Sequence, residues 1–573
     1  MFGVTKTRFE QLSTLDLVLL LGATLLIPTR LAVVSFLVLL WLASRQLACR
    51  SYGRLHQFIW GYVYFAVVLA SLFMISWLVG VRISTNGVLL LLATATWWLT
   101  VFHSLPPRED KKRRAEAVSM LTVGLLTCLF VALPVLRHPS AATVVRYAAH
   151  TGDDINHIAM IESTRQTGGY LYTNDRQKHA NLIEFRYVNY PQGWHVNGAF
   201  LENLLVRLVG SDSLTVRVVS YYGYALLWLF LAVYLLFELA VTTFRLFTKR
   251  TSTKDVMVMA GVIGLLAITL LVPLFGYGFQ TFIATIVFLL GSSVLAVEYL
   301  GAKTDSRGSS YLVGLALMCV GATFTWVLSG VTIGLIVADV LVRTMIVQKD
   351  FLKRLPWTVW LGWSLVAMLA LMQLFVQLRL SSKGAGSIDS LGAVPPLSTL
   401  MTLILVVVTM LAVVRQATHA RWLAWIMAAV SLEWAVLALH QQLVFGTQHY
   451  YVVKLGYSVA LIASVFLLAI GVAATSAVRQ KTWMVVLMLA FLALPYLLGV
   501  DIKKSAYPLK NSAPIRPVIA QQLLMTSPEN QQLIILTSKP EESYLATKFW
   551  SSVWTNNSPQ RQALLRKLDA TLH

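Results

Sequence analysis

A pair of adjacent carboxylates, Asp153 and Asp154, lies in a long polar stretch between apolar segments of this 573-residue chain. His157 follows at helical spacing, so all three side chains can approach one face of a helix. A carboxylate beside an imidazole is a reasonable general base for deprotonating a hydroxyl group. One aspartate could instead only cap the helix, a role that does not need both. We therefore expect Asp153 and Asp154 to be catalytic and His157 to bind substrate.

A second motif, YPQGWH at residues 190–195, follows in the same polar stretch. Tyr190, Trp194 and His195 are candidates for contacting a polar ligand, and Arg186 could bind an anion. Two alternatives stay open. Tyrosine and tryptophan also gather at the headgroup depth of a membrane, and an isolated arginine is often only solvated.

A third candidate region, QHYYVVK at residues 448–454, precedes an apolar segment. Lys454 could hold a lipid-linked phosphate at the membrane boundary, with His449 and Tyr450 as hydrogen-bond partners. The same residues could instead form an aromatic belt with a lysine that reaches toward the headgroups.

The elements that must position these residues are membrane-spanning helices. With 57% hydrophobic residues, 12% charged residues and a mean hydropathy of +0.69, the chain is too apolar for an ordinary soluble enzyme. Apolar runs near the spanning length of about 20 residues recur along it, and we expect about 13 to 15 transmembrane helices. The first two runs could also be one broken segment. The expected runs are 12–28, 30–44, 59–80, 87–103, 116–136, 219–243, 256–274, 277–300, 311–328, 330–347, 357–378, 399–414, 422–440, 456–478 and 483–500.

The formal net charge of +21 comes from lysine and arginine residues concentrated in alternate loops. This is the positive-inside pattern, and it predicts a cytoplasmic N-terminus and an extracytoplasmic C-terminus in the plasma membrane. The outer segments are then 137–218, 379–398, 440–455 and the tail after 500. A nucleic acid partner is not expected, because the basic residues are scattered over many connectors and form no single face.

The distribution of apolar and polar segments predicts two domains. Residues 1–500 form the transmembrane domain, whose long outer loop at 137–218 carries the candidate active site. In that loop we expect amphipathic helices, one after Gly152 that ends at Gly168 and one from Pro191 to Leu208. Residues 501–573 form a small outer domain of mixed α/β type, with a strand at 533–536 and a helix at 541–550.

This combination resembles the GT-C glycosyltransferases, which are many-spanning proteins with an acidic motif in a long outer loop. Within that superfamily, GDD at 152–154 followed by YPQGW at 190–194 is similar to the actinobacterial cell-wall arabinofuranosyltransferases and related envelope proteins. The architectural likeness covers most of the chain, whereas the motifs cover only the region from 150 to 200. One departure is that about five expected spans precede the acidic motif, which in this superfamily usually follows the first.

The resemblance implies an inverting transfer from a polyprenyl-phosphate sugar to a glycan or glycolipid acceptor of the cell envelope. Asp153 or Asp154 would deprotonate the acceptor hydroxyl, and Lys454 would stabilise the departing lipid phosphate. A divalent cation, Mg²⁺ or Mn²⁺, could sit beside the paired carboxylates, although no convincing set of metal ligands is visible.

Two other functions remain compatible with the sequence. A transporter or flippase of lipid-linked saccharides could use Asp339 and Glu433, which lie within expected spans, to line a central path. A glycan polymerase or ligase would share the donor class and differ only in what is transferred.

Overall fold

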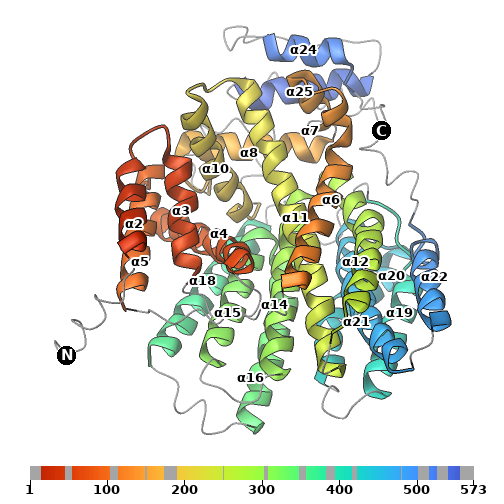
Figure 1. Cartoon of the computed structure of the whole chain (residues 1–573). Helices are drawn as coiled ribbons and strands as arrows, with labels where there is room; N and C mark the ends of the chain where they lie inside the picture. The colour runs from red at the N-terminus through yellow and green to blue at the C-terminus, as the bar shows by residue number, and fades with distance from the viewer. Residues whose placement is uncertain are drawn as a thin grey trace, which may run out of the picture.

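The computed structural model describes residues 14–45, 54–102, 114–148, 151–172, 190–248, 251–301, 308–347, 357–381, 394–415, 422–478, 481–500, 515–525 and 540–554. Every regular element within these ranges is a helix, and no strand occurs among them. The expected helical fold class is therefore confirmed for this part of the chain (Figure 1).

Eight of the described helices are long and apolar enough to cross a membrane. The multi-pass architecture is confirmed, with eight such helices rather than about 13 to 15 meeting both criteria. One of the eight, Thr253–Gly276, comprises α12, a π-helical turn η3 and α13. They are α4 (Arg54–Leu78), α6 (Arg114–Arg137), α11 (Leu214–Phe247), α12 (Thr253–Leu266) with η3 (Ala267–Leu271) and α13 (Val272–Gly276), α14 (Gln280–Gly301), α16 (Val327–Val347), α20 (Trp422–Phe445) and α21 (Tyr450–Val478).

Other expected runs form further helices. Two of these, α2 and α3, have 13 residues each, so each rises only about 20 Å against a hydrocarbon thickness of about 30 Å. They pack against each other as a hairpin, which favours two short helices over one broken segment. The set comprises α2 (Thr14–Leu26), α3 (Ala32–Ser44), α5 (Thr85–Phe102), α15 (Gly308–Thr325), α18 (Trp357–Ser381), α19 (Thr399–Arg415) and α22 (Lys481–Leu497).

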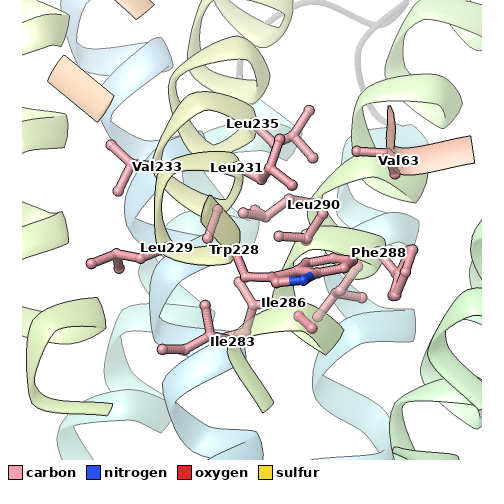
Figure 2. Packing of buried hydrophobic residues seen from close by; sticks show 14 of the residues in the cluster. Val63, Trp228, Leu229, Leu231, Val233, Leu235, Ile283, Ile286, Phe288 and Leu290 are labelled. Carbon is pink, nitrogen blue, oxygen red and sulfur yellow. The ribbon is translucent and has the colours of Figure 1, made fainter. Parts of the chain in front are cut away.

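The core of the bundle forms around α11, which packs along α6, α14 and α21. Its 34 residues are apolar on nearly all sides, which is typical of a helix enclosed by other helices. Trp228 lies at the centre, and its ring is 5.6 Å from that of Phe288 on α14. Figure 2 shows Ile283, Ile286 and Leu290 around the same indole. At about 50 Å, α11 is longer than the hydrocarbon core of a membrane is thick. Its N-terminal end therefore extends past the core and can contact the shorter helices there.

Three shorter helices lie at the end of the bundle drawn at the top of Figure 1, here called the upper end: α7 (Ala141–Ala148), α8 (Gly152–Thr167) and α10 (Gly193–Val209). The two expected helices of the long loop are thus confirmed. Gly168 ends α8 in the left-handed conformation, with φ of 68°, as expected. However, α8 is buried on nearly all sides and does not lie with one face open to water.

Five ionisable side chains connect α8 to α10 and to the start of α11. Arg165 contacts Glu162 at 2.9 Å, Glu202 at 3.3 Å and Asp212 at 3.1 Å, and Arg217 contacts Glu162 and Asp212. Three carboxylates thereby share two guanidinium groups. Burial, with the Glu162 charge adding to it, raises the pKa of Glu202 to about 8, so this carboxyl retains its proton at neutral pH.

Two helices of the tail cover the upper end: α24 (Pro517–Met525) packs on α7, and α25 (Pro540–Trp554) packs on α8 (Figure 1). The Arg146 guanidinium of α7 donates to the Ile515 carbonyl at 2.7 Å, and Arg516 pairs with Glu542 at 2.9 Å. The helix expected at 541–550 is confirmed. The strand expected at 533–536 lies outside the described residues, and the described tail is helical, so a mixed α/β domain is not supported there.

Candidate active site

The two aspartates lie in the first turn of α8, where the helix dipole stabilises carboxylates. Thr151 caps this helix by accepting a hydrogen bond from the Asp154 backbone N–H at 3.1 Å. The Thr151 hydroxyl also donates to Asp154 Oδ2 at 2.8 Å. The local sequence therefore fixes both the start of α8 and the direction of the Asp154 side chain.

Asp154 is an anchored carboxylate. Its side chain is 1% exposed, and Oδ1 accepts hydrogen bonds from the Tyr221 hydroxyl at 2.7 Å and from Gln280 Nε2 at 3.3 Å. Together with Thr151, three donors compensate the cost of burying this charge. A carboxylate occupied in this way by groups of α8, α11 and α14 fixes the position of α8 and has little capacity left for a substrate.

Asp153 has a different environment. It is partly exposed, and its Oδ2 accepts a hydrogen bond from the Tyr450 hydroxyl of α21 at 3.0 Å. The same hydroxyl accepts a hydrogen bond from the Lys454 ammonium. One tyrosine oxygen, 297 residues from Asp153 in the sequence, thus joins a carboxylate to an ammonium.

Lys454 is 4% exposed and lies between two aromatic rings. Its Nζ is 3.6 Å from the ring centroid of Phe279 and 3.8 Å from that of Tyr450. The electron-rich faces of such rings stabilise a cation where water is excluded. The arrangement supplies a charged group beside Asp153 without a direct ion pair between them.

Two buried histidines contact each other beside these residues. His157 Nδ1 and His195 Nε2 are 2.9 Å apart, and both rings are buried. Burial, partly opposed by Asp153, lowers the pKa of His157 to about 4. Burial and the neighbouring His157 hold the pKa of His195 well below its usual range. Both imidazoles are therefore neutral at physiological pH and can exchange hydrogen bonds but not supply positive charge.

The structure places Tyr190 next to this histidine pair and Trp194 beneath it. The Tyr190 hydroxyl hydrogen bonds to Thr281 Oγ1 at 3.0 Å, and its ring is 6.2 Å from that of His157. Burial raises the pKa of Tyr190 above its usual range, so the hydroxyl stays protonated. Trp194 is 0% exposed, and its ring packs on that of Tyr224 with centroids 4.6 Å apart, so it lies in the core beside the histidine pair.

The remaining expected residues lie elsewhere or outside the described chain. The His449 ring packs on Phe445 at 4.7 Å, at the turn between α20 and α21. Arg186 lies outside the described residues. Asp339 pairs with Arg343 on its own helix at 2.9 Å, and Glu433 accepts a hydrogen bond from Thr332.

Sequence reasoning missed four contributors: Tyr221 and the neighbouring residues Gly278, Phe279 and Gln280. Gly278, Phe279 and Gln280 fell within the expected membrane span at 277–300, but the helix α14 begins only at Gln280. A signal was present, because a glycine and a glutamine interrupt an otherwise apolar run there. Tyr221 carried no comparable signal, since it lies in a helix rich in buried aromatic residues.

The described residues offer no group of three or more His, Cys, Asp and Glu side chains that could hold a metal ion. The Mg²⁺ or Mn²⁺ considered beside the paired carboxylates therefore has no fitting ligand set in this part of the chain. Coordination by two neighbouring carboxylates alone is also disfavoured, because Asp154 is already held by three donors.

Comparison of the sequence with protein-family models gave no match, and comparison with curated proteins gave none either. The resemblance to GT-C glycosyltransferases thus depends on the helical architecture and the short motifs alone.

Proposed function

We propose that this protein is an inverting glycosyltransferase that uses a polyprenyl-phosphate sugar to glycosylate an acceptor of the cell envelope. The observation that carries the proposal is the bridge from Asp153 through the Tyr450 hydroxyl to Lys454. It brings a carboxylate able to take a proton and an ammonium able to bind a phosphate to the same place. Transfer of a sugar from a lipid phosphate to a hydroxyl needs these two groups.

The step is a single displacement. Asp153 takes the proton of the acceptor hydroxyl as the acceptor oxygen attacks the anomeric carbon of the donor sugar. A new carbon–oxygen bond forms on the face opposite the phosphate, and the bond from the anomeric carbon to the phosphate oxygen breaks. The polyprenyl phosphate leaves as an anion whose charge Lys454 stabilises. In the absence of acceptor, the Tyr450 hydroxyl occupies the hydrogen-bonding position on Asp153.

Asp153 is assigned as the base because it is partly exposed and, within the described part of the chain, accepts one side-chain hydrogen bond, from Tyr450. Asp154 is assigned as the anchor because it is buried and accepts three side-chain hydrogen bonds. Hydrogen bonds to a carboxylate stabilise its charged form and lower its basicity. The two aspartates of the motif thus have separate tasks.

A lipid-linked donor is consistent with the surroundings of the site. Lys454 and Tyr450 belong to α21, and Gln280 begins α14, both of which are long and apolar enough to cross a membrane. The carboxylates come from α8, which lies at the upper end of the bundle (Figure 1). A donor with its isoprenoid chain in the bilayer would present its phosphate at this boundary. The positive-inside pattern of the sequence predicts that the same end lies outside the cytoplasm.

The experiment is a transfer assay with purified protein reconstituted in lipid. It offers a panel of radiolabelled polyprenyl-phosphate sugars together with crude envelope acceptors. We expect label to move to the acceptor with inverted anomeric configuration, and Lys454→Met to lower the rate by at least about 100-fold. Lys548→Met is the matched control, because Lys548 is also buried and lies over an aromatic ring, that of Tyr544 in α25.

Labelled donor that crosses the bilayer intact, with no glycosylated product, would overturn the proposal in favour of a transporter. Transfer of a preassembled glycan chain but not of a single sugar would instead identify a polymerase or ligase.

A further inference from the structure

Four consecutive residues, Gly278 to Thr281, contact Asp154, Lys454 and Tyr190 of the candidate site. This segment, called here the 278–281 turn, connects α13 to the first turn of α14. It touches Asp154 on one side and Lys454 on the other, and Thr281 holds the Tyr190 hydroxyl. Tyr450 joins Asp153 to Lys454 from α21, and the 278–281 turn is a second connection, which reaches Asp154 and Lys454 from α14.

The path of the chain into this turn is tightly defined. The π-helical turn η3 and then Pro273 interrupt the regular α-helix, and the N–H groups of residues 277–279 donate to the carbonyls of Pro273, Phe275 and Leu274 at 3.0–3.1 Å. Single π-helical turns inside α-helices are frequent at functional sites, because they redirect the residues that follow. Here the redirected residues are those that meet α8 and α21.

On the acidic side, the turn approaches α8 as closely as a peptide backbone can. Gly278 has φ of +78°, and a Cβ added to it would lie 2.3 Å from Thr151 Oγ1 and 3.0 Å from Asp154 Oδ2. Only glycine satisfies both the conformation and the space. Gln280 then donates to Asp154 Oδ1 at 3.3 Å and to the Phe275 carbonyl at 3.2 Å, which ties the aspartate to the turn itself.

On the basic side, Phe279 supplies one of the two rings that enclose the Lys454 ammonium. Phe279 meets the Tyr450 ring edge to face, with centroids 5.3 Å apart and an interplanar angle of 86°. The other ring of the pair belongs to the same helix as Lys454, so Phe279 is the ring that connects the ammonium to the 278–281 turn. The Phe279 side chain is 2% exposed, as buried as the ammonium that it contacts.

We infer that the 278–281 turn is the positioning element that sets the acidic and basic halves of the site relative to each other. Phe279 acts through Lys454 and governs binding of the donor phosphate. Gln280 acts through Asp154 and governs the placement of Asp153 against the acceptor. This inference depends on the proposed glycosyl transfer for the identity of the donor, and it adds two residues that the motifs of the sequence do not include.

The two roles predict that variants of Phe279 and of Gln280 affect different steps, donor binding in the first case and transfer in the second. Phe279→Leu keeps an apolar side chain but removes the ring, and we expect binding of polyprenyl monophosphate to weaken about 10- to 30-fold. Gln280→Met keeps the shape but removes both donated hydrogen bonds. It should leave that binding within about twofold and lower the single-turnover transfer rate by at least about tenfold.

Binding is measured on full-length protein in lipid nanodiscs, with polyprenyl monophosphate and neutral polyprenol as probes. Phe288→Leu is the matched control, because Phe288, on α14, is as buried as Phe279 and packs on Trp228 rather than on Lys454. Phe279→Tyr keeps an aromatic ring and should restore phosphate binding. Phe279 replaced by fluorinated phenylalanines, which withdraw electrons from the ring at nearly constant shape, should weaken phosphate binding stepwise and leave polyprenol binding unchanged.

Equal losses of phosphate binding in Phe279→Leu and Phe288→Leu would overturn the inference, as would parallel losses of binding and turnover in Phe279→Leu and Gln280→Met. A wild-type protein that neither binds polyprenyl monophosphate nor transfers sugar would instead overturn the proposed function, so the two failures are distinguishable.

Discussion

At the residue scale, the histidine pair makes the stability of the upper end depend on pH. His157 has a pKa of about 4 in the folded protein against 6.5 as its ordinary value, because it is buried. Between these values the unfolded chain binds more protons than the folded one, so stability falls as the pH is lowered through this window. The loss reaches about 3 kcal/mol for this residue once the pH is below the folded pKa.

We therefore predict that the unfolding temperature of the wild type falls between about pH 7 and about pH 4.5, and that it falls less in His157→Gln. Thermal unfolding in detergent, followed by intrinsic fluorescence at the two pH values, checks this. The His195→Gln variant should also flatten the dependence, since burial lowers the pKa of His195 in the same direction. An unchanged pH dependence in both variants would contradict the assignment of a neutral pair.

For the cluster of ionisable side chains of α8, α10 and α11, we predict the opposite pH dependence: stability falls as the pH rises. Glu202 has a folded pKa of about 8 against 4.5 as its ordinary value, so the folded state binds more protons in this window and stability is lost as the pH rises through it. Glu202→Gln should remove much of this loss, so we expect its unfolding temperature to exceed that of the wild type at about pH 9 and to approach it at about pH 6. Circular dichroism melts at both values give the comparison.

Asp212→Asn is the control in the same cluster. Burial alone would raise the pKa of Asp212, but hydrogen bonding to Arg217 outweighs this effect and lowers the pKa. The Asp212 carboxylate therefore stays charged from pH 6 to 9. Its replacement should lower the unfolding temperature by a similar amount at both values. A Glu202→Gln variant that behaves like Asp212→Asn would show that Glu202 is ionised in the folded protein.

The sequence indicated which residues are candidates for chemistry but not the different environments in which they lie. Asp153, Asp154 and His157 were recognisable because a carboxylate pair and a histidine stand out in a chain of this hydrophobicity. The distinction between the proposed base and the proposed anchor was not predictable. It is made by Tyr221, Gln280 and Tyr450, which belong to α11, α14 and α21 and approach α8 only in the folded chain.

At the element scale, the 278–281 turn should tolerate almost no change at its glycine. Gly278→Ala combines an unfavourable positive φ with a Cβ that would collide with Thr151, and we expect it to cost more than about 2 kcal/mol of stability and to impair transfer. Gly446→Ala is the matched control. Gly446 also has a positive φ, 68°, but nothing lies within 4 Å of an added Cβ, so its cost should be only about 1 kcal/mol.

Urea or thermal unfolding of both glycine variants provides the measurement. Equal destabilisation of the two would mean that the close approach of the turn to α8 contributes nothing.

This turn also marks where prediction of elements from the sequence failed. The helices after Gly152 and after Pro191 were predictable, because a capping residue, a proline and terminal glycines define their ends. Hydropathy alone, however, extended the span at 277–300 across the turn, since Tyr277 and Phe279 are as apolar as their neighbours. Burial of α8 on all sides was equally hidden, because the helix that covers it, α25, comes from the far end of the chain.

At the scale of the whole molecule, α7, α8, α10, α24 and α25 lie together at the upper end, so they should face the same side of the membrane (Figure 1). We predict that side to be the extracytoplasmic one. With the three native cysteines replaced, Val518→Cys on α24, where the side chain is 67% exposed, should react with a membrane-impermeant maleimide in intact cells. Lys254→Cys, at the exposed start of α12, should react only after permeabilisation. The reverse labelling pattern would contradict the proposed orientation.

Composition was sufficient to predict a multi-pass helical membrane protein, because no soluble fold could bury so much apolar sequence. It was not sufficient to count the crossings. Runs such as those that form α2 and α3 are apolar enough but yield helices of only 13 residues, whose ends are set by turns that hydropathy does not register.

The central claim is that Asp153 is the base and Asp154 the anchor, and the most direct test compares Asp153→Asn with Asp154→Asn in the reconstituted transfer assay. The unfolding temperature of each variant is measured alongside. We predict that Asp153→Asn keeps the wild-type unfolding temperature and loses about 10²- to 10⁴-fold in rate. Asp154→Asn should lose about 1–3 kcal/mol of stability and a smaller part of the rate. A stable but inactive Asp154→Asn beside an active Asp153→Asn would contradict the claim.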